Sequence, residues 1–224
     1  MSHEVLRGSW YFLSGLPAPD VNLAMVHQND RDVLSKTLNE ITRMNVQTCL
    51  FLAAKGKNLS SELPDAWTHV GVSQFMGIVL SKSEQVFDAR VSLVSLDDID
   101  AVVVLLAESF LLDPTNFSFF VEILKSPNSL SNIWLLKEDG VAVSTVTTTL
   151  IDDELTVWCM ATPPQYARKG YGRALLNDVL ARNADAGAKY GILGATPDGQ
   201  PLYVASGWEV LEEWDVYVNS PVNL

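Results

Sequence analysis

The stretch PPQYARKGYGRALLNDVL, residues 163–180, decides how the rest of this sequence is interpreted. Its two prolines end the preceding segment, because proline has a fixed φ and no amide hydrogen. Gly170 and Gly172 then lie one residue apart among basic side chains. Apolar residues from Leu175 onward recur at helical spacing, and Gly187 is a natural helix end. The stretch therefore predicts a glycine-rich turn that opens an amphipathic helix.

The charge of the chain is acidic overall but unevenly distributed. The formal net charge of -12 argues against a general nucleic-acid binder, since such a protein needs a basic face. Residues 88–224 carry eight basic and nineteen acidic residues, yet five of those eight basic residues lie between Arg168 and Lys189. Two interpretations of this cluster are open: a solvated helix face, or a local anion site in an acidic domain.

Cysteine and histidine are too few and too scattered for a disulfide framework or a metal centre. Cys49 and Cys159 have no CxxC spacing, and all three histidines lie in the first third of the chain. We therefore expect no metal ion and a reducing, cytoplasmic location. The sequence has no long uninterrupted apolar window and no secretory pattern at its N-terminus, so we expect neither a membrane span nor secretion.

The order of elements predicts the fold class. Residues 88–224 read as strand, helix, short helix, three strands, helix, strand, helix and strand, and the turns KEDG and IDDE join the three strands into an antiparallel meander. Residues 1–82 read as strands around a helix that starts at Asn29 or Asp30. The prediction is an α/β fold with a mixed, largely antiparallel sheet flanked by helices, divided into domains 1–82 and 88–224.

A glycine-rich turn between a strand and a helix is suited to hold an anion. The first helical turn leaves several amides without intrahelical partners, and the helix dipole adds partial positive charge there. Glycine removes the side chains that would keep phosphate oxygens away. A dinucleotide fingerprint would need glycine where Leu175 stands, and the stretch has no P-loop spacing, so these two phosphate loops are excluded.

Residues 167–172, AlaArgLysGlyTyrGly, resemble the acetyl-CoA pyrophosphate loop of the GNAT superfamily of N-acetyltransferases, whose signature is Gln/Arg-x-x-Gly-x-Gly/Ala. Pro164 stands at the usual proline position. Ala167 replaces the first signature residue, and Arg168 can substitute for it. A second stretch, LeuTyrValAlaSerGlyTrp at 202–208, is similar to the family pattern Leu-Tyr-x-x-x-Gly-Phe. The resemblance covers residues 88–224 and implies a GNAT fold and transfer of acetyl from acetyl-CoA to an amine.

The resemblance implies a set of coenzyme contacts. The pantetheine would pair with exposed backbone groups around Met160, Ala161 and Thr162, and an amide near Met160 would stabilise the oxyanion. Thr196 occupies a position where many members have an asparagine that contacts CoA. The pyrophosphate would lie on the loop and the first turn of the helix, that is on Arg168, Lys169, Gly170, Tyr171, Gly172 and Arg173.

The resemblance also implies catalytic roles. Tyr203 matches the tyrosine that protonates the departing thiolate, the alternative being a packing tyrosine. Glu154 stands where some relatives keep a glutamate as general base, although a solvated turn carboxylate is the favoured interpretation. Cys159 is expected to be a small core residue rather than a nucleophile, so the amine would attack directly in a ternary complex.

Residues 1–82 loosely resemble the degenerate N-terminal half of tandem acetyltransferase-like proteins and predict a non-catalytic lobe. Trp10, Tyr11, Asn22 and Trp67 could line a pocket there, although core packing is favoured for the aromatic residues. The expected partner is a small-molecule amine, and we expect the protein to bind neither nucleic acid nor a membrane. The resemblance to the family also implies that the protein could form a homodimer. The competing hypotheses are an acyl-CoA-sensing module without turnover and a fold-level coincidence with a structural role.

Overall fold

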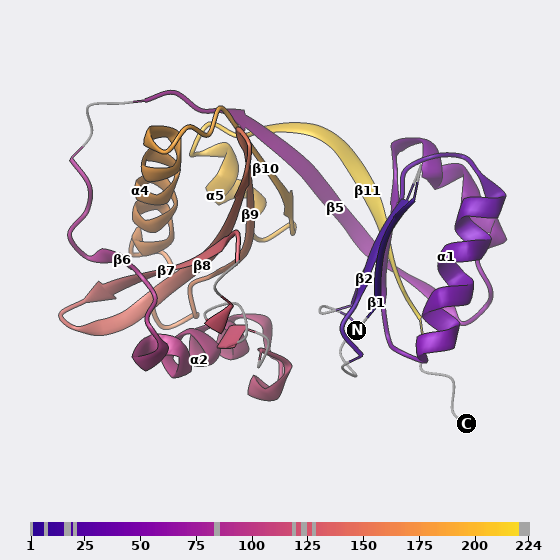
Figure 1. Ribbon diagram of the computed structural model, residues 1–224, viewed down its shortest axis with the longest axis horizontal. Helices are drawn as coiled ribbons and strands as arrows, with labels where there is room; N and C mark the ends of the chain where they lie inside the picture. Colours follow the sequence, from indigo (N-terminus) through magenta and orange to yellow (C-terminus); the bar gives the residue numbers. More distant parts are fainter. Residues whose placement is uncertain are drawn as a thin grey trace. The chain divides into compact units, whose positions relative to one another are not determined.

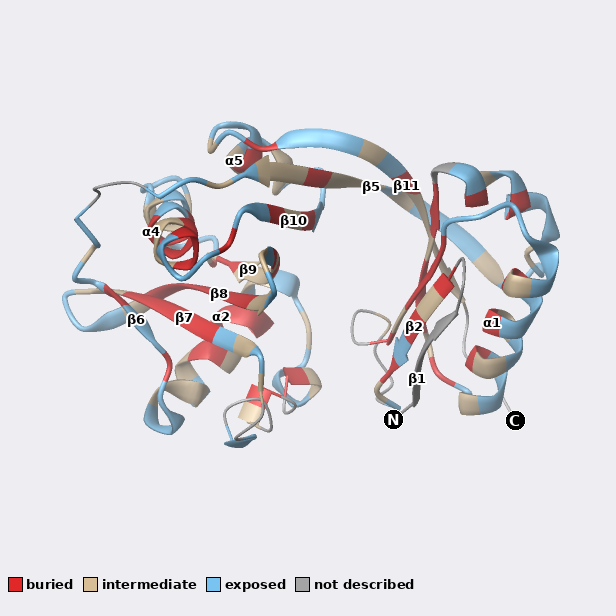
Figure 2. Ribbon diagram, turned by 45° about the horizontal axis from the view of Figure 1, so that its top comes forward, coloured by how far each residue is buried: buried red, intermediate tan, exposed pale blue. Residues whose placement is uncertain are grey.

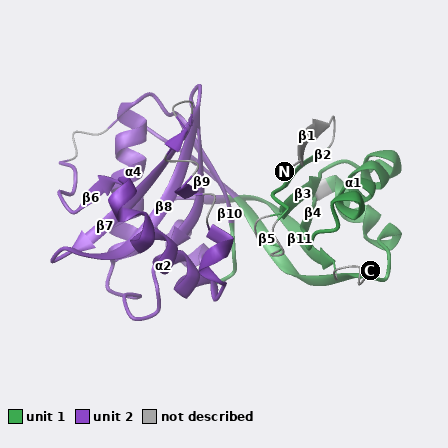
Figure 3. Ribbon diagram, turned by 60° about the horizontal axis from the view of Figure 1, so that its bottom comes forward, with its two compact units in different colours: residues 1–75, 195–198, 210–224 green, residues 76–194, 199–209 purple. Residues whose placement is uncertain are grey.

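The computed structural model describes residues 2–6, 9–15, 19, 22–82, 86–117, 120–121, 125–126 and 129–219. The chain divides into two compact units, unit 1 with residues 1–75, 195–198 and 210–224, and unit 2 with residues 76–194 and 199–209 (Figure 3). The predicted functional division between residues 1–82 and 88–224 stays a prediction. The compact units do not follow that boundary, because the C-terminal strand packs in unit 1 by pairing with a strand far away in the sequence.

Unit 1 is a sheet with a helix on one face (Figure 1). Its elements are β1 (Ser2–Leu6), β2 (Ser9–Leu13), β3 (Asn22–Val26), α1 (Arg31–Met44), β4 (Cys49–Ala53), the 3₁₀ segment η2 (Ala54–Glu62), β5 (Trp67–Val79) and β11 (Glu209–Asn219). The last few residues of β5 and the first of β11 belong to unit 2. The strand order is β1-β2-β3-β4-β11-β5, with β3 and β4 parallel and β4 and β11 antiparallel. Asp30 caps α1, as predicted, by accepting hydrogen bonds from the amides of Asp32 and Val33.

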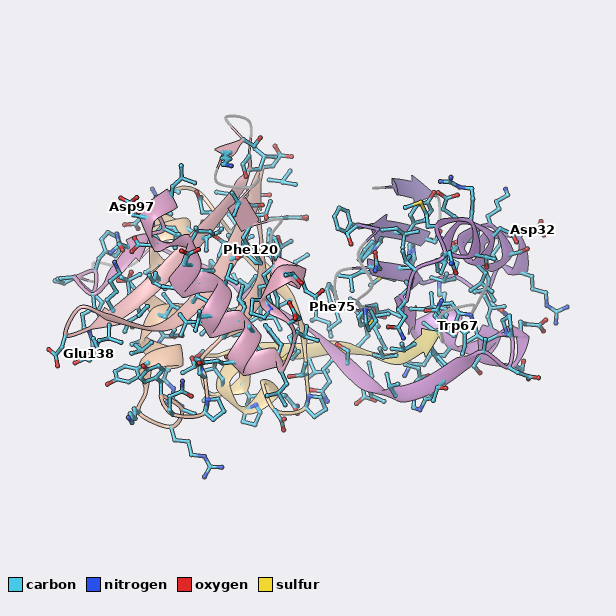
Figure 4. All side chains as sticks on the ribbon, turned by 90° about the horizontal axis from the view of Figure 1, so that it is seen from below. Asp32, Trp67, Phe75, Asp97, Phe120 and Glu138 are labelled. Atoms are coloured by element: carbon cyan, nitrogen blue, oxygen red, sulfur yellow. The ribbon has the colours of Figure 1, made fainter. Side chains whose placement is uncertain are left out.

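The two faces of the unit 1 sheet carry different clusters. Tyr11 and Trp67 pack in the core under α1, whereas Trp10 belongs to a cluster around Trp214. Trp67 and Phe75 both lie on β5 (Figure 4). Phe75 stacks on Trp214, with ring centroids 4.6 Å apart. Trp10 and Tyr11 therefore face opposite sides of the sheet, as strand neighbours do. The structure does not gather the four residues that the sequence suggested for a pocket.

Unit 2 is a sheet with α2 on one face and α4 on the other (Figure 1). Its elements are β6 (Val91–Leu93), the 3₁₀ turn η3 (Leu96–Asp98), α2 (Ile99–Phe110), the 3₁₀ turn η4 (Pro114–Phe117), β7 (Ser131–Glu138), β8 (Val141–Ile151), β9 (Glu154–Ala161), α4 (Tyr171–Asp185), β10 (Tyr190–Ala195, whose last residue belongs to unit 1) and α5 (Gln200–Val204). The strand order is β5-β10-β9-β8-β7-β6. β10 runs parallel to β9, and β6 to β9 are antiparallel neighbours.

The predicted fold class is confirmed, and the meander, the crossover helix and the strand that follows it lie where the sequence placed them. Buried residues line the central strands and the inner sides of the helices (Figure 2). Five of the eleven residues of the short helix predicted at 116–126 lie outside the described residues, and Phe117 belongs to η4. Neither β1 nor η2 is predicted from the sequence. No helix among the described residues is long and apolar enough to cross a membrane.

A buried carboxylate ties α4 to the segment before β6. The Asp178 side chain is 1% exposed, accepts a hydrogen bond from the amide of Asp88 at 2.5 Å, and pairs with Arg182 Nε at 2.5 Å. The Arg182 guanidinium lies over the Phe87 ring, 4.4 Å from its centroid. Arg182, which the sequence placed in the basic cluster, therefore has a structural role.

We expect Asp178→Ala to lower the free energy of unfolding by about 3 kcal/mol, because it leaves Arg182 and the Asp88 amide without their partner in a buried setting. Urea denaturation measures this change. Asp185→Ala is the matched control, since Asp185 is exposed on the same helix and should change stability by less than about 0.5 kcal/mol. Equal losses in the two variants would contradict the anchoring role.

Candidate functional site

Strand β9 contains a β-bulge beside the predicted pantetheine contacts. Thr145 pairs with Ala161 and Thr147 pairs with Trp158, so two residues of β9, Cys159 and Met160, oppose one residue of β8. Cys159 has a φ of 48°, which is unusual for a residue other than glycine. A bulge of this kind turns backbone groups away from the ladder, and such features concentrate next to active sites. Sequence reasoning missed it, since no glycine or proline marks the position.

Strands β9 and β10 pair over only part of their length. The parallel register runs from Tyr190 opposite Glu154 to Ile192 opposite Thr156, and no later pair joins the two strands among the described residues. The second half of β9, which contains the bulge, therefore has a side that β10 does not cover with ladder hydrogen bonds. The predicted pantetheine contacts at Met160, Ala161 and Thr162 lie at this end of β9, where the Ala161 carbonyl accepts a hydrogen bond from Ser144 Oγ.

The start of α4 presents backbone amides, as the sequence predicted. Gly170 precedes the helix with a φ of 86°, and the first helical hydrogen bond runs from the Ala174 amide to the Gly170 carbonyl at 2.9 Å. No described residue accepts a hydrogen bond from the amides of residues 168–173. A side chain built on Gly170 would meet no atom within 4 Å. These amides are therefore open to an anion, and the helix dipole favours one.

Gly172 has a different role, because it lets the helix approach β9 closely. A Cβ atom on Gly172 would lie 3.1 Å from Thr162 Oγ1, 3.4 Å from Met160 Cε and 3.7 Å from Leu202 Cδ2. The first turn of α4 is thus packed between the end of β9 and α5. The structure brings together the two predicted groups of coenzyme contacts, residues 160–162 and residues 168–173.

The positive charge at this turn is available to a ligand. Arg168, Lys169 and Arg173 are exposed, and no carboxylate of the described residues pairs with them. The other two members of the basic cluster are engaged, Arg182 with Asp178 and Lys189 with Asp153 at 2.9 Å. Two of the five clustered cations are therefore in ion pairs, and three at the anion loop have no carboxylate partner among the described residues, with Lys169 Nζ 5.9 Å from the centroid of the Tyr166 ring.

Tyr203 lies on α5 and is 8% exposed. Burial and, to a smaller extent, the charge interaction with Cys159 raise the pKa of its phenol to about 12. Its ring packs edge-on against Trp208, with centroids 6.0 Å apart. The structure therefore places a phenol that keeps its proton at neutral pH near the β9 bulge.

Two further predicted site residues lie on other parts of the chain. Glu154 is exposed at the β8–β9 turn, six residues before Met160 and so roughly 20 Å away along the strand. Thr196 follows β10 in the segment 195–198, which belongs to unit 1. The predicted roles of Glu154 as a base and of Thr196 as a coenzyme contact stay predictions.

Sequence reasoning also missed the polar contacts that hold the loop before α4. Gln165 Nε2 donates to Glu108 Oε2 of α2 at 2.6 Å, and Ser144 of β8 bonds the end of β9. These are cross-strand and cross-layer contacts, for which a single sequence gives no local signal. The described residues hold no cluster of three or more histidine, cysteine or acidic side chains placed to bind a metal ion.

The chain is similar to a protein family and to several solved structures. Residues 100–208 match the family model described as the acetyltransferase (GNAT) family. The chain is similar to a GCN5-related N-acetyltransferase from Kribbella flavida, with a TM-score of 0.69, 17% identity and coverage of 99% of this chain and 90% of that one. A GCN5-related N-acetyltransferase from Sphaerobacter thermophilus gives a TM-score of 0.64 at 16% identity, covering 97% and 79%.

A functionally unknown conserved protein from Staphylococcus epidermidis is similar too, with a TM-score of 0.67, 13% identity and coverage of 99% and 94%. At these identities the solved structures show a shared fold, and they share it over nearly the whole chain. No curated protein matches this sequence.

Proposed function

We propose that this protein, whose residues 100–208 match the family model of the GNAT acetyltransferases, transfers acetyl from acetyl-CoA to the amine of a small molecule. The observation that carries the proposal is the open row of amides at residues 168–173, flanked by three unpaired cations. A diphosphate is the ligand that suits such a helix start, because it accepts several hydrogen bonds and its charge is complementary.

The residues present fit the coenzyme that this function requires. The absence of a side chain at Gly170 leaves the amides accessible, and the uncovered side of β9 offers backbone groups to an amide-bearing chain. Acetyl-CoA supplies the reactive thioester. The protein would hold the diphosphate on α4, align the pantetheine along β9 as an added strand, and aim an amide near Met160 at the developing oxyanion.

In this proposal the phenol of Tyr203 donates a hydrogen bond to the departing sulfur of the coenzyme. A phenol with a pKa of about 12 stays neutral at pH 7 and can donate a hydrogen bond to the sulfur as negative charge develops there. Complete transfer to a thiolate with an ordinary thiol pKa of about 8.5 would be uphill by roughly 5 kcal/mol. We therefore favour donation of a hydrogen bond during departure, with the thiolate taking its final proton from the ammonium that the attack creates.

We expect Tyr203→Phe to lower kcat by about ten-fold or more, the usual range for loss of a general acid or its hydrogen bond. Steady-state release of free thiol measures it. The folded protein should remain intact, since the ring and its contact with Trp208 are kept. Unchanged turnover would reject the role.

The same variant has a pH signature that does not depend on activity. The folded pKa of Tyr203 lies above the unfolded value of about 10, so wild-type stability is full below pH 10 and falls as the pH rises toward 12. Urea unfolding should show a smaller alkaline loss for Tyr203→Phe than for the wild type.

Glu154 is the general base implied by the resemblance, but its position at the β8–β9 turn argues against direct contact with the amine. The predicted cytoplasmic location, homodimer and acceptor class likewise stay predictions.

The function is tested in two steps. Acetyl-CoA should raise the melting temperature, since a ligand that binds only the folded state stabilises it by mass action. Thiol release should then be followed across a panel of diamines, amino acids and amino sugars. Binding without acetylation of any amine would favour the acyl-CoA-sensing alternative, and no melting shift would reject both functions.

A further inference from the structure

We propose that Ser144 is a positioning residue of the acetyl-transfer site, an inference that rests on the proposed function. Its hydroxyl, together with that of Thr162, forms a clamp that holds the β9 bulge and the start of α4 in one fixed relation. The clamp would thereby set where the thioester carbonyl lies against the bulge when the diphosphate is held on α4.

The clamp is short and fully buried on the Ser144 side. Ser144 is 0% exposed, and its Oγ donates to the carbonyl oxygen of Ala161 at 3.0 Å. Ser144 Oγ also lies 2.8 Å from Thr162 Oγ1. A hydroxyl carries one proton, and a carbonyl can only accept, so the Thr162 hydroxyl is the donor to Ser144. Both hydroxyl protons of the clamp are therefore assigned by elimination.

The clamp lies immediately after the strained part of β9. Ala161 follows the bulge at Cys159 and Met160, and Cys159 has a φ of 48°. Before the bulge, Trp158 Nε1 donates to Thr149 Oγ1 of β8 at 3.2 Å. An unfavourable backbone conformation persists only where its surroundings fix it. These side-chain bonds fix β9 to β8 on both sides of the two extra residues.

The same clamp touches the anion loop. The position of a Cβ on Gly172 would be 3.1 Å from Thr162 Oγ1, so the threonine hydroxyl lies against the first turn of α4. One end of the hydroxyl pair is thus bonded beside the bulge, and the other end packs beside the open amides. Loss of the Ser144 hydroxyl would remove the hydrogen bonds that fix the bulge relative to the start of α4. It would leave the amides of α4 unchanged.

The test uses acetyl-CoA labelled with ¹³C at the thioester carbonyl, because this signal reports hydrogen bonding to the carbonyl in the bound state without any acceptor. The measured quantity is the ¹³C chemical shift of the thioester carbonyl. Binding to Ser144→Ala should change this chemical shift, relative to free acetyl-CoA, by at most half as much as binding to the wild type does. With an amine found in the panel, we expect kcat to fall at least ten-fold and KM for acetyl-CoA to change less than three-fold.

Two matched variants separate positioning from stability. Thr148→Val removes another fully buried hydroxyl from β8, one that accepts from Trp134 Nε1 at 2.9 Å, and should leave the carbonyl signal and kcat unchanged at a comparable loss of stability. Thr162→Val should shift the bound carbonyl signal as Ser144→Ala does, whereas Thr162→Ser, which keeps the hydroxyl, should restore the wild-type carbonyl signal.

The outcomes distinguish the two levels of inference. If the wild-type protein binds acetyl-CoA but acetylates no amine, the proposed function is rejected. The carbonyl signal of bound acetyl-CoA then still tests whether the clamp positions the thioester. A bound carbonyl signal in Ser144→Ala identical to that of Thr148→Val would overturn the clamp while leaving the transferase intact. A wild-type protein that does not bind acetyl-CoA overturns both.

Discussion

Gly170→Asp is expected to weaken acetyl-CoA binding about thirty-fold or more. Gly170 precedes α4 with a φ of 86° and open space around it, at the end of the helix where amides of residues 168–173 are available. A carboxylate at this position would compete for those amides and repel the diphosphate. A thirty-fold loss of affinity corresponds to about 2 kcal/mol of binding free energy, which is a modest repulsion for two charges near a protein surface. Isothermal titration of acetyl-CoA measures it.

Gly170→Asn is the matched control, because asparagine has the same shape as aspartate, carries no charge and tolerates the left-handed conformation better than most residues. We expect its affinity to lie within about three-fold of the wild type. Repulsion should also weaken with salt, so the difference between the two variants should narrow as ionic strength rises. Equal affinities for the aspartate and asparagine variants would contradict the assignment of the anion site.

Gly56→Ala is expected to lower the stability of unit 1 by about 3 kcal/mol or more. A Cβ on Gly56 would lie 2.2 Å from the carbonyl oxygen of Val26 and 3.0 Å from its carbon. Both atoms belong to the backbone at the end of β3, so no side-chain rotation can relieve the overlap. Either η2 or β3 must move, and overpacking that shifts the backbone costs at the upper end of the usual range.

Chemical denaturation of Gly56→Ala followed by the fluorescence of the unit 1 tryptophans measures this loss. Lys55→Ala is the control, since Lys55 is the exposed neighbour in the same segment and its removal should cost less than about 0.5 kcal/mol. A stability close to that of the wild type would show that the contact between η2 and β3 is not as close as described.

Much of unit 2 could be predicted because its signals are local. The glycines at 170 and 172, the helix that follows and the turns between β7, β8 and β9 each depend on a few adjacent residues. The two motifs stand in the right order around β10, and the family match over residues 100–208 confirms the resemblance. The amides at the start of α4 were predicted for the same reason, since every helix start leaves them without partners.

The parts that could not be predicted depend on contacts between distant segments. The bulge at Cys159 exists because β8 and β9 change register, which neither strand shows alone. Ser144 appears in the sequence as one more polar residue of β8, and only its bonds to Ala161 and Thr162 reveal its place. For Glu154 the sequence favoured a solvated turn carboxylate over the general base that the resemblance implies, and the structure shows it exposed at the start of β9.

The position of β11 in unit 1 affects the order in which the two units can fold during synthesis. β11 pairs with β4 from Trp214 opposite Ala53 to Val218 opposite Cys49, so unit 1 takes a neighbour for its parallel pair from the far end of the chain. Domains usually fold in the order in which they are synthesised. Here the strands up to β4 are synthesised before β11, so one edge of β4 stays uncovered until unit 2 has been synthesised.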